Sequence, residues 1–403
     1  MTLAGPTVPA ETAGVPWLRL HNQVAPTLVI VGTAAMLTTG FVELAANRLV
    51  SGRPVSLWNC VPTPVAVAIA LLAVVLVALS VVRPRRLVRG AAAFAAGVLV
   101  IAIPAVAGRA AASLTAGAPA LATVSLGSAC WVIFACAALA LIDALQRAEA
   151  RPPAQLLTIA LIGAGFFVLA KAGVFDALSL AREYASRRDV FAAAFVRHIE
   201  LVVAAILPAL LIGVPLGLAA LRRKRFEAPV FAALNLLQTV PSIALFGLLI
   251  GPLSSLAAGV PALGRLGIGG VGPAPAIIAL VLYALLPIAR NTLAGIGGVS
   301  PAALDAARGM GMTPRQVFWQ VEVPLALPVL LAGLRIVTVQ AIGLTIVAAL
   351  IGAGGLGSFV FEGLGQYATD LVLLGALPAI LLALGVDFLL RLATAGMRGH
   401  FAA

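Results

Sequence analysis

The stretch from Ser300 to Pro328 reads SPAALDAARGMGMTPRQVFWQVEVPLALP, and it is a charged interruption in a half of the chain that is otherwise almost continuously apolar. Ser300 followed by Pro301 predicts a helix start, because serine caps free N–H groups and proline needs none at the first helical position. The helix should end at Gly309 or Gly311, since glycine readily adopts the positive φ of a helix C-terminus. We therefore expect a short helix followed by a turn.

A second pair of start signals follows this turn. Thr313 and Gln316 have the spacing of a capping box, in which each side chain accepts a hydrogen bond from the other residue's backbone N–H, and Pro314 stands at the first helical position. This second helix is expected to end at Pro324 and Pro328, because proline inside a helix removes a hydrogen bond. Two short helices joined by a glycine turn predict a compact knob that suits contact with a water-soluble partner.

The composition excludes a soluble protein. Of the 403 residues, 62% are hydrophobic and 10% are charged, and the mean hydropathy is +1.13, values typical of a polytopic membrane protein. Crossing the hydrocarbon takes about 20 apolar residues. We therefore predict an all-α integral membrane protein with about ten transmembrane helices, near residues 24–44, 61–82, 90–108, 121–142, 155–174, 199–221, 229–252, 275–295, 326–350 and 369–392.

The segment 175–198 separates the first five predicted spans from the last five. Its charged residues alternate with apolar residues at helical spacing, which favours an amphipathic helix on the extracytoplasmic membrane surface. The predicted organisation is an N-terminal membrane extension over 1–174, this surface segment, and a second membrane domain over 199–395 that contains the loop 300–324.

The net charge of +12 fits a membrane topology better than binding to nucleic acid, which we discount. Basic residues gather in short loops between spans, as the positive-inside rule expects of cytoplasmic loops, and they suit contact with anionic membrane lipid. If the loop 300–324 is cytoplasmic, both termini of this inner-membrane protein are cytoplasmic too. These basic residues then face the same side: Arg83, Arg85, Arg86, Arg89, Arg147, Arg151, Arg222, Arg223, Lys224 and Arg225.

The loop resembles the EAA loop of permease subunits of binding-protein-dependent ABC importers, the cytoplasmic element that docks into the ATP-binding subunit. Asp and Val stand where the family has Glu and Leu, which are conservative changes. The resemblance implies a type I ABC importer permease core in the C-terminal half. It implies a coupling loop made of Asp305, Ala306, Ala307, Gly311, Val321 and Pro324.

Three further runs, at 234–249, 275–292 and 327–357, are similar to the osmoprotectant branch of these permeases. That branch imports glycine betaine, choline and carnitine, and includes a longer variant with extra N-terminal spans. The resemblance implies three protein partners: an ATP-binding cassette subunit, a separate extracytoplasmic substrate-binding protein, and a second permease in a homo- or heterodimer. It places ATP and Mg on the cassette subunit and implies no cofactor in this chain.

Polar side chains inside the apolar spans predict a translocation pathway. Such groups usually face a cavity or another helix, and Pro241 would bend its span and free a backbone carbonyl. An uncharged polar lining suits a zwitterion that must not bind tightly. The alternative, that these groups only join helices by hydrogen bonds, has equal weight for any one of them. The candidates are Asn235, Gln238, Thr239, Ser242 and Gln340.

Charged residues near the cytoplasmic ends of the spans have simpler interpretations. Asp387 and Arg391 are four residues apart, as in a helical ion pair. Arg290 and Arg335 are expected to extend to the membrane surface or to contact the docking loop.

No catalytic or metal site is predicted. The chain has no GxxxxGK[ST] pattern and no nucleophile–base arrangement, and Cys60, Cys130 and Cys136 lack metal-ligand spacing. Two other functions stay open: an ABC permease for another small solute such as an amino acid, and an ion-coupled secondary transporter, which would need internal repeats and embedded acidic residues. A structural or receptor role for the first five spans also stays open.

Overall fold

The computed structural model describes residues 21–47, 50–83, 85–119, 121–265 and 267–401. The chain divides into an N-terminal unit that ends at Arg182 and a C-terminal unit that begins at Glu183. In the described part of the chain, nine helices are long and apolar enough to cross a membrane. The predicted all-α polytopic fold is therefore confirmed.

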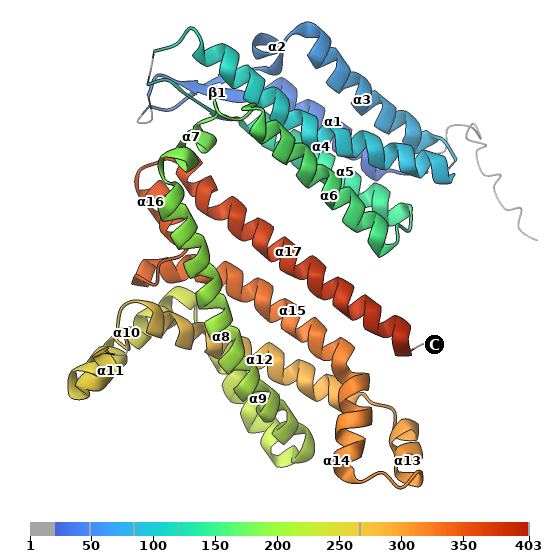
Figure 1. Ribbon diagram of the computed structural model, residues 1–403, viewed down its shortest axis with the longest axis vertical. Coiled ribbons are helices and arrows are strands. Elements are labelled where there is room, and N and C mark those ends of the chain that lie inside the picture. The colour runs from blue at the N-terminus through green and yellow to red at the C-terminus, as the bar shows by residue number, and fades with distance from the viewer. Residues whose placement is uncertain (1–20, 48–49, 84, 120, 266, 402–403) are drawn as a thin grey trace, which may run out of the picture. The chain divides into compact units, whose positions relative to one another are not determined.

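The N-terminal unit is a layer of helices with a small antiparallel sheet of order β2-β1-β3 (Figure 1). In the sheet, Val42 of β1 pairs with Val55 of β2 and with Leu126 of β3. Its elements are α1 (Val24–Thr38), β1 (Val42–Ala45), β2 (Arg53–Val55), α2 (Leu57–Cys60), α3 (Thr63–Val81), α4 (Arg86–Thr115), β3 (Thr123–Leu126), α5 (Ser128–Arg147) and α6 (Pro152–Lys171).

Alanine residues on α4 let its neighbours approach closely, as small residues do at helix contacts in membranes. Ala96, Ala107 and Ala111 are fully buried, and α4 packs against α5 and α3. The β-strand residues Val42 and Val124 are also fully buried and join the same apolar core. The sheet therefore closes one end of this helical unit.

The sheet corrects two predicted spans. The first was expected over 24–44, but α1 ends at Thr38, because the chain enters strand β1 at Val42. With 15 residues, α1 is shorter than the usual span of about 20 residues. The span expected over 121–142 begins only at Ser128, because residues 123–126 form β3. Apolar residues in these places belong to strands, which composition alone did not reveal.

The C-terminal unit is built around α12, which packs against α8, α15, α9 and α10, while α15 also packs against α17 (Figure 1). The short α7 (Ser179–Ser186) lies across the division between the units. The following elements are α8 (Arg188–Arg222), α9 (Lys224–Thr239), α10 (Ser242–Gly259), α11 (Pro261–Arg265), α12 (Pro273–Gly297), α13 (Pro301–Gly309), α14 (Pro314–Val317), the π-helix η1 (Phe318–Glu322), α15 (Val323–Ala348), the 3-10 turn η2 (Ala349–Ile351), α16 (Gly357–Gly365) and α17 (Thr369–Phe401).

Two expected boundaries in this unit differ from the structure. The segment 175–198 does not form one separate amphipathic helix, since α8 begins at Arg188 and runs without interruption to Arg222. The span expected over 229–252 is two helices, because α9 stops at Thr239 and α10 starts after Pro241. Proline has no N–H to continue the hydrogen-bond ladder of α9.

Candidate functional site

The predicted helix–turn–helix knob, residues 300–324, begins as the sequence indicates. The side chain of Ser300 accepts a hydrogen bond from the backbone N–H of Ala303 at 3.2 Å. α13 ends at Gly309, and Gly311 has φ +80°, a conformation that residues with a Cβ rarely adopt. The first helix and its glycine turn are therefore confirmed.

The capping box after the turn is also formed. The backbone N–H of Thr313 donates to Gln316 Oε1 at 2.8 Å, and the N–H of Gln316 donates to Thr313 Oγ1 at 3.4 Å. These bonds satisfy two of the donors that a helix start leaves free. The position of α14 is thus fixed by its own first residues.

The second helix does not end at Pro324 or Pro328, which corrects the prediction. α14 widens into the π-helix η1, and α15 continues from Val323 with Pro324 in its first turn. A π-turn changes the hydrogen-bond spacing just where the missing proline N–H would break an α-helix. The second half of the knob is therefore continuous with α15 in a single helical rod of 38 residues, Pro314–Ile351, which is long and apolar enough to cross a membrane.

Of the six predicted coupling residues, three are exposed and three are buried or half-buried. Asp305, Ala306 and Gly311 are exposed, and Asp305 pairs with Arg308 at 3.3 Å on the helix surface. Ala307 is buried, and Val321 and Pro324 are half-buried. The first three residues are therefore open to the surroundings, while the other three are wholly or partly covered by the rest of the chain.

Beside the knob lies a groove that the sequence alone did not reveal. Its volume is about 460 Å³. Trp319 is 66% exposed at its edge, and the guanidinium of Arg222 stands 5.2 Å from the ring centre of Phe318. Part of the groove is formed by Arg222 at the end of α8, which lies far from the knob in sequence and close to it only in the folded chain. Its lining comprises Leu218, Arg222, Arg308, Met312, Pro314, Arg315, Val317, Phe318, Trp319 and Glu322.

Four of the five predicted pathway residues surround the break between α9 and α10. Gln238 Nε2 donates to the carbonyl of Tyr283 at 2.6 Å, and Asn235 Oδ1 accepts from Arg290 at 2.9 Å, so both join α9 to α12. Thr239 bonds within its own helix, Ser242 begins α10, and the half-buried Gln340 lies on α15. The lining role stays a prediction for all five residues.

Comparison with known proteins gives the family. The family model of the inner membrane component of binding-protein-dependent transport systems matches residues 209–399. The osmoprotectant import permease protein OsmW of Salmonella typhimurium is 44% identical over 199 residues, which cover 48% of this chain and 86% of that protein. The chain belongs to this family of ABC transporter permeases.

Further comparisons cover both halves of the permease. Residues 20–181 match the N-terminal domain of the ABC transporter permease YehY. The choline transport system permease protein OpuBB of Bacillus subtilis is 39% identical, covering 49% of this chain and 83% of that protein. The carnitine transport permease protein OpuCB of Listeria monocytogenes is 41% identical, covering 48% and 82%. A solved structure of the MetNI methionine ABC transporter covers 53% of this chain and 98% of that chain, at 23% identity and TM-score 0.45.

Three ionic residues on α15 and α17 of the permease are paired. Asp387 and Arg391 form the predicted ion pair on α17 at 2.8 Å. Arg335 was expected to reach the membrane surface or the knob, but its guanidinium pairs with Asp387. The correction has a physical reason, because an arginine that meets a carboxylate on a packed helix need not extend to water.

Proposed function

We propose that the permease is the membrane-spanning subunit of an ATP-driven importer for quaternary-amine osmoprotectants such as glycine betaine or choline. The support is that similar permeases carry names for osmoprotectant, choline and carnitine transport. The family model matches residues 209–399, and the organisation proposed is a core over 199–395 with an N-terminal extension over 1–174. Another small solute, such as an amino acid, is the alternative substrate.

The proposed assembly has three partners. An ATP-binding cassette subunit, which would hold ATP and Mg, docks on the knob 300–324. A second permease, identical or related, completes the pathway, and an extracytoplasmic binding protein delivers the substrate. The permease lies in the inner membrane with both termini cytoplasmic, which takes the shorter α1 as a tenth crossing beside the nine longer helices. This orientation places the basic loops after α3, α5 and α8 on the cytoplasmic side, as the positive-inside rule expects.

The observation that carries this proposal is the unbroken rod from the knob into the membrane. Asp305, Ala306 and Gly311 offer an exposed surface, and the groove beside them ends at the exposed ring of Trp319. Exposed aromatic rings often anchor protein interfaces. Because helix η1 links this surface directly to α15, and α15 packs against α12 and α17, a force on the knob would tilt the core of the membrane domain.

The translocation pathway is proposed near the break between α9 and α10. There Asn235, Gln238, Thr239 and Ser242 offer uncharged polar groups, with Gln340 on a helix that contacts α10. Such groups can replace part of the hydration of a zwitterion without the strong attraction of an opposite charge. The two hydrogen bonds between α9 and α12 would hold this lining in place.

The test compares Gly311→Asp with Gly309→Asp in the full chain, purified with its co-purifying subunits and reconstituted in vesicles. Both changes add one carboxylate to the exposed knob, but of these two glycines Gly311 alone has a positive φ, so Gly311→Asp strains the turn and Gly309→Asp does not. We expect Gly311→Asp to abolish cassette binding and ATP-driven uptake of radiolabelled glycine betaine, and Gly309→Asp to keep most of both.

Two results would contradict the proposal. Equal uptake by the two variants would exclude the turn as the coupling site. Uptake that persists without ATP and collapses with the ion gradient would indicate an ion-coupled transporter. The substrate is tested separately, by competition of unlabelled choline, carnitine and amino acids with the labelled betaine.

A further inference from the structure

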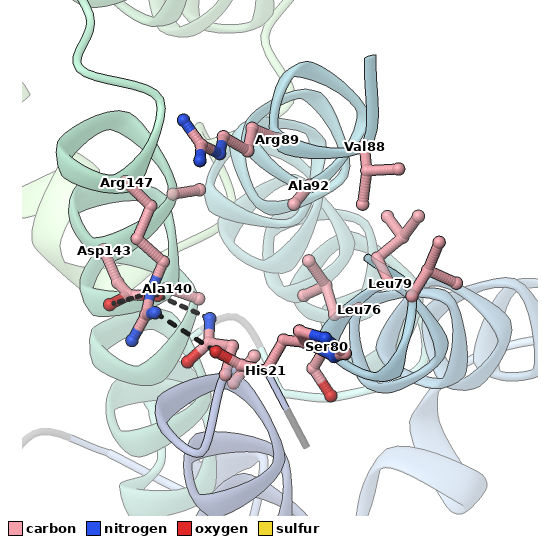
Figure 2. A pocket seen from close by; sticks show the side chains of 14 residues that line it. His21, Leu76, Leu79, Ser80, Val88, Arg89, Ala92, Ala140, Asp143 and Arg147 are labelled. Atoms are coloured by element: carbon pink, nitrogen blue, oxygen red, sulfur yellow. Dashed lines mark hydrogen bonds and ion pairs between the residues drawn. The ribbon is translucent and has the colours of Figure 1, made fainter. Parts of the chain in front are cut away.

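A cavity in the N-terminal unit lies where several helices end together (Figure 2). α3 ends at Val81, α4 begins at Arg86, α5 ends at Arg147, and the chain enters α1 at Val24. The walls therefore meet near the level where apolar helices leave the hydrocarbon. The cavity volume is about 180 Å³, several times the roughly 30 Å³ that one water molecule occupies in the liquid.

One side of the cavity is closed by a satisfied polar network (Figure 2). Asp143 accepts hydrogen bonds from Asn22 Nδ2 at 2.7 Å and from Arg147 Nε at 2.9 Å. Arg147 also donates to the backbone carbonyl of His21 at 3.4 Å, and the N–H of His21 donates to the carbonyl of Ser80 at 3.0 Å. The carboxylate of Asp143 is thus already engaged with a cation.

Arg89, on the first turn of α4, lines the same cavity without such a partner. Its Nε is shielded from solvent and has no hydrogen-bond partner among the described residues. The arginine and acidic residues that line the cavity supply two guanidinium groups and one carboxylate, and that carboxylate is bound to Arg147. Shielding a charged donor without an acceptor is costly. The excess of guanidinium groups over carboxylates in the lining, together with the unpartnered Nε, indicates a site for an anionic oxygen next to Arg89.

The rest of the wall is apolar, so the anion that fits best carries an aliphatic part. A free inorganic anion would leave this surface facing water. The start of α4 adds the exposed Arg85, its N-cap, and Arg86, its first residue, which would attract an anionic membrane surface. The apolar lining comprises Ala25, Leu76, Leu79, Val82, Val88, Ala92, Ala140 and Ala144.

We propose that this cavity binds the phosphodiester group of a membrane phospholipid. The guanidinium of Arg89 holds a phosphate oxygen, and the apolar wall holds the adjoining glycerol and first acyl carbons. The bound lipid bridges the ends of α3, α4 and α5. The site lies wholly in the N-terminal unit and does not depend on the transport function proposed for the chain.

The test measures lipid binding to the full chain after lipid depletion in a neutral detergent. Native mass spectrometry and thermal unfolding are recorded with phosphatidylglycerol, with diacylglycerol of the same acyl chains, and with inorganic phosphate. The variants are Arg89→Gln, Arg89→Lys, and Arg86→Gln as a control that removes a neighbouring exposed arginine outside the cavity.

The expected result is that phosphatidylglycerol binds and raises the unfolding temperature, while diacylglycerol and inorganic phosphate do not. Arg89→Gln should weaken lipid binding about tenfold or more, as expected for the loss of a charge-assisted hydrogen bond. Arg86→Gln should keep the affinity, and Arg89→Lys should keep part of it. Without lipid, Arg89→Gln should unfold no earlier than the wild type, because it removes an unpaired charge, so weak binding cannot be ascribed to misfolding.

Three results would overturn the proposal. An equal effect of Arg89→Gln and Arg86→Gln would show a diffuse surface attraction. An Arg89-dependent stabilisation by inorganic phosphate alone would make this a free-anion site. The third result concerns Glu11, which is the single acidic residue among the first twenty. If added lipid has no effect and Glu11→Gln lowers the unfolding temperature, the cavity is occupied by the N-terminal segment of the chain and not by lipid.

Discussion

The hydroxyl of Tyr283, on α12, donates a hydrogen bond to the backbone carbonyl of Val240, at the end of α9. The end of a helix leaves carbonyl groups without helical donors, and the next helix, α10, starts only at Ser242, after Pro241. The tyrosine therefore replaces a bond that the helix break removes. With Gln238, which donates to the carbonyl of Tyr283, it fixes the broken helix to the centre of the unit.

Tyr283→Phe should lower the free energy of unfolding by about 1–3 kcal/mol, because the Val240 carbonyl loses its donor in a water-poor region. Thermal and denaturant unfolding of the purified chain measure the change. Tyr184→Phe is the matched control, since Tyr184 is 42% exposed in the same unit. Equal losses in the two variants would argue against a role for the hydroxyl.

Thr313→Ala should loosen α14 and reduce ATP-driven uptake, because it removes a helix cap worth about 1 kcal/mol. Hydrogen exchange of the backbone amides in 315–317 should become several-fold faster. Thr313→Ser keeps the capping oxygen and should behave as the wild type. If exchange in the alanine variant is unchanged, the capping box does not stabilise the knob.

Gly217→Ala should destabilise the contact between α8 and α12. A Cβ at Gly217 would lie 2.5 Å from the carbonyl oxygen of Ala289 and 2.7 Å from the Cβ of Thr292, and such overpacking costs about 1–3 kcal/mol. Gly247→Ala is the control on α10, where nothing lies within 4 Å of the added carbon. That change should stabilise the helix by about 0.5–1 kcal/mol, so the two unfolding temperatures should move in opposite directions.

Asp387→Asn should destabilise the pairing of α15 with α17 by about 2 kcal/mol, between the values for exposed and buried ion pairs. A double-mutant cycle separates its two partners. The side chain of Arg335 is 35% exposed and that of Arg391 is 59% exposed. Asp387 should therefore couple more strongly to Arg335 than to Arg391, and the reverse order would exclude Arg335 as the principal partner.

Local signals in the sequence predicted the knob well. The residues that set its helix ends act on backbone groups only a few positions away, so their spacing in the sequence is enough to predict them. These residues are Ser300, Gly311, Thr313 and Gln316. The long apolar spans were also predictable, because the thickness of the bilayer fixes their length. The helix ends of the knob are set by contacts between residues close in sequence, and the length of the spans is set by the surrounding bilayer.

Features that depend on distant parts of the chain were not predictable in this way. The pairing of Arg335 with Asp387 and the groove between Arg222 and Trp319 join helices far apart in sequence. The apolar residues at 123–126 fit the pattern of a helical span as well as that of a buried strand, and only the pairing with β1 shows that they form a strand. Arg89 was recognised only as one basic loop residue, since its lack of a partner follows from packing.

The π-turn at Phe318–Glu322 also sets the angle at which the knob faces its surroundings. Each residue of an α-helix turns the chain by about 100°, and a π-turn accommodates extra chain within one turn. Removing one residue from this turn would return the rod to the α-helical repeat, with Pro324 still leaving one backbone carbonyl without its helical donor. The knob would then point in a different direction around the rod axis. A subunit docked on it would therefore be rotated relative to the membrane domain.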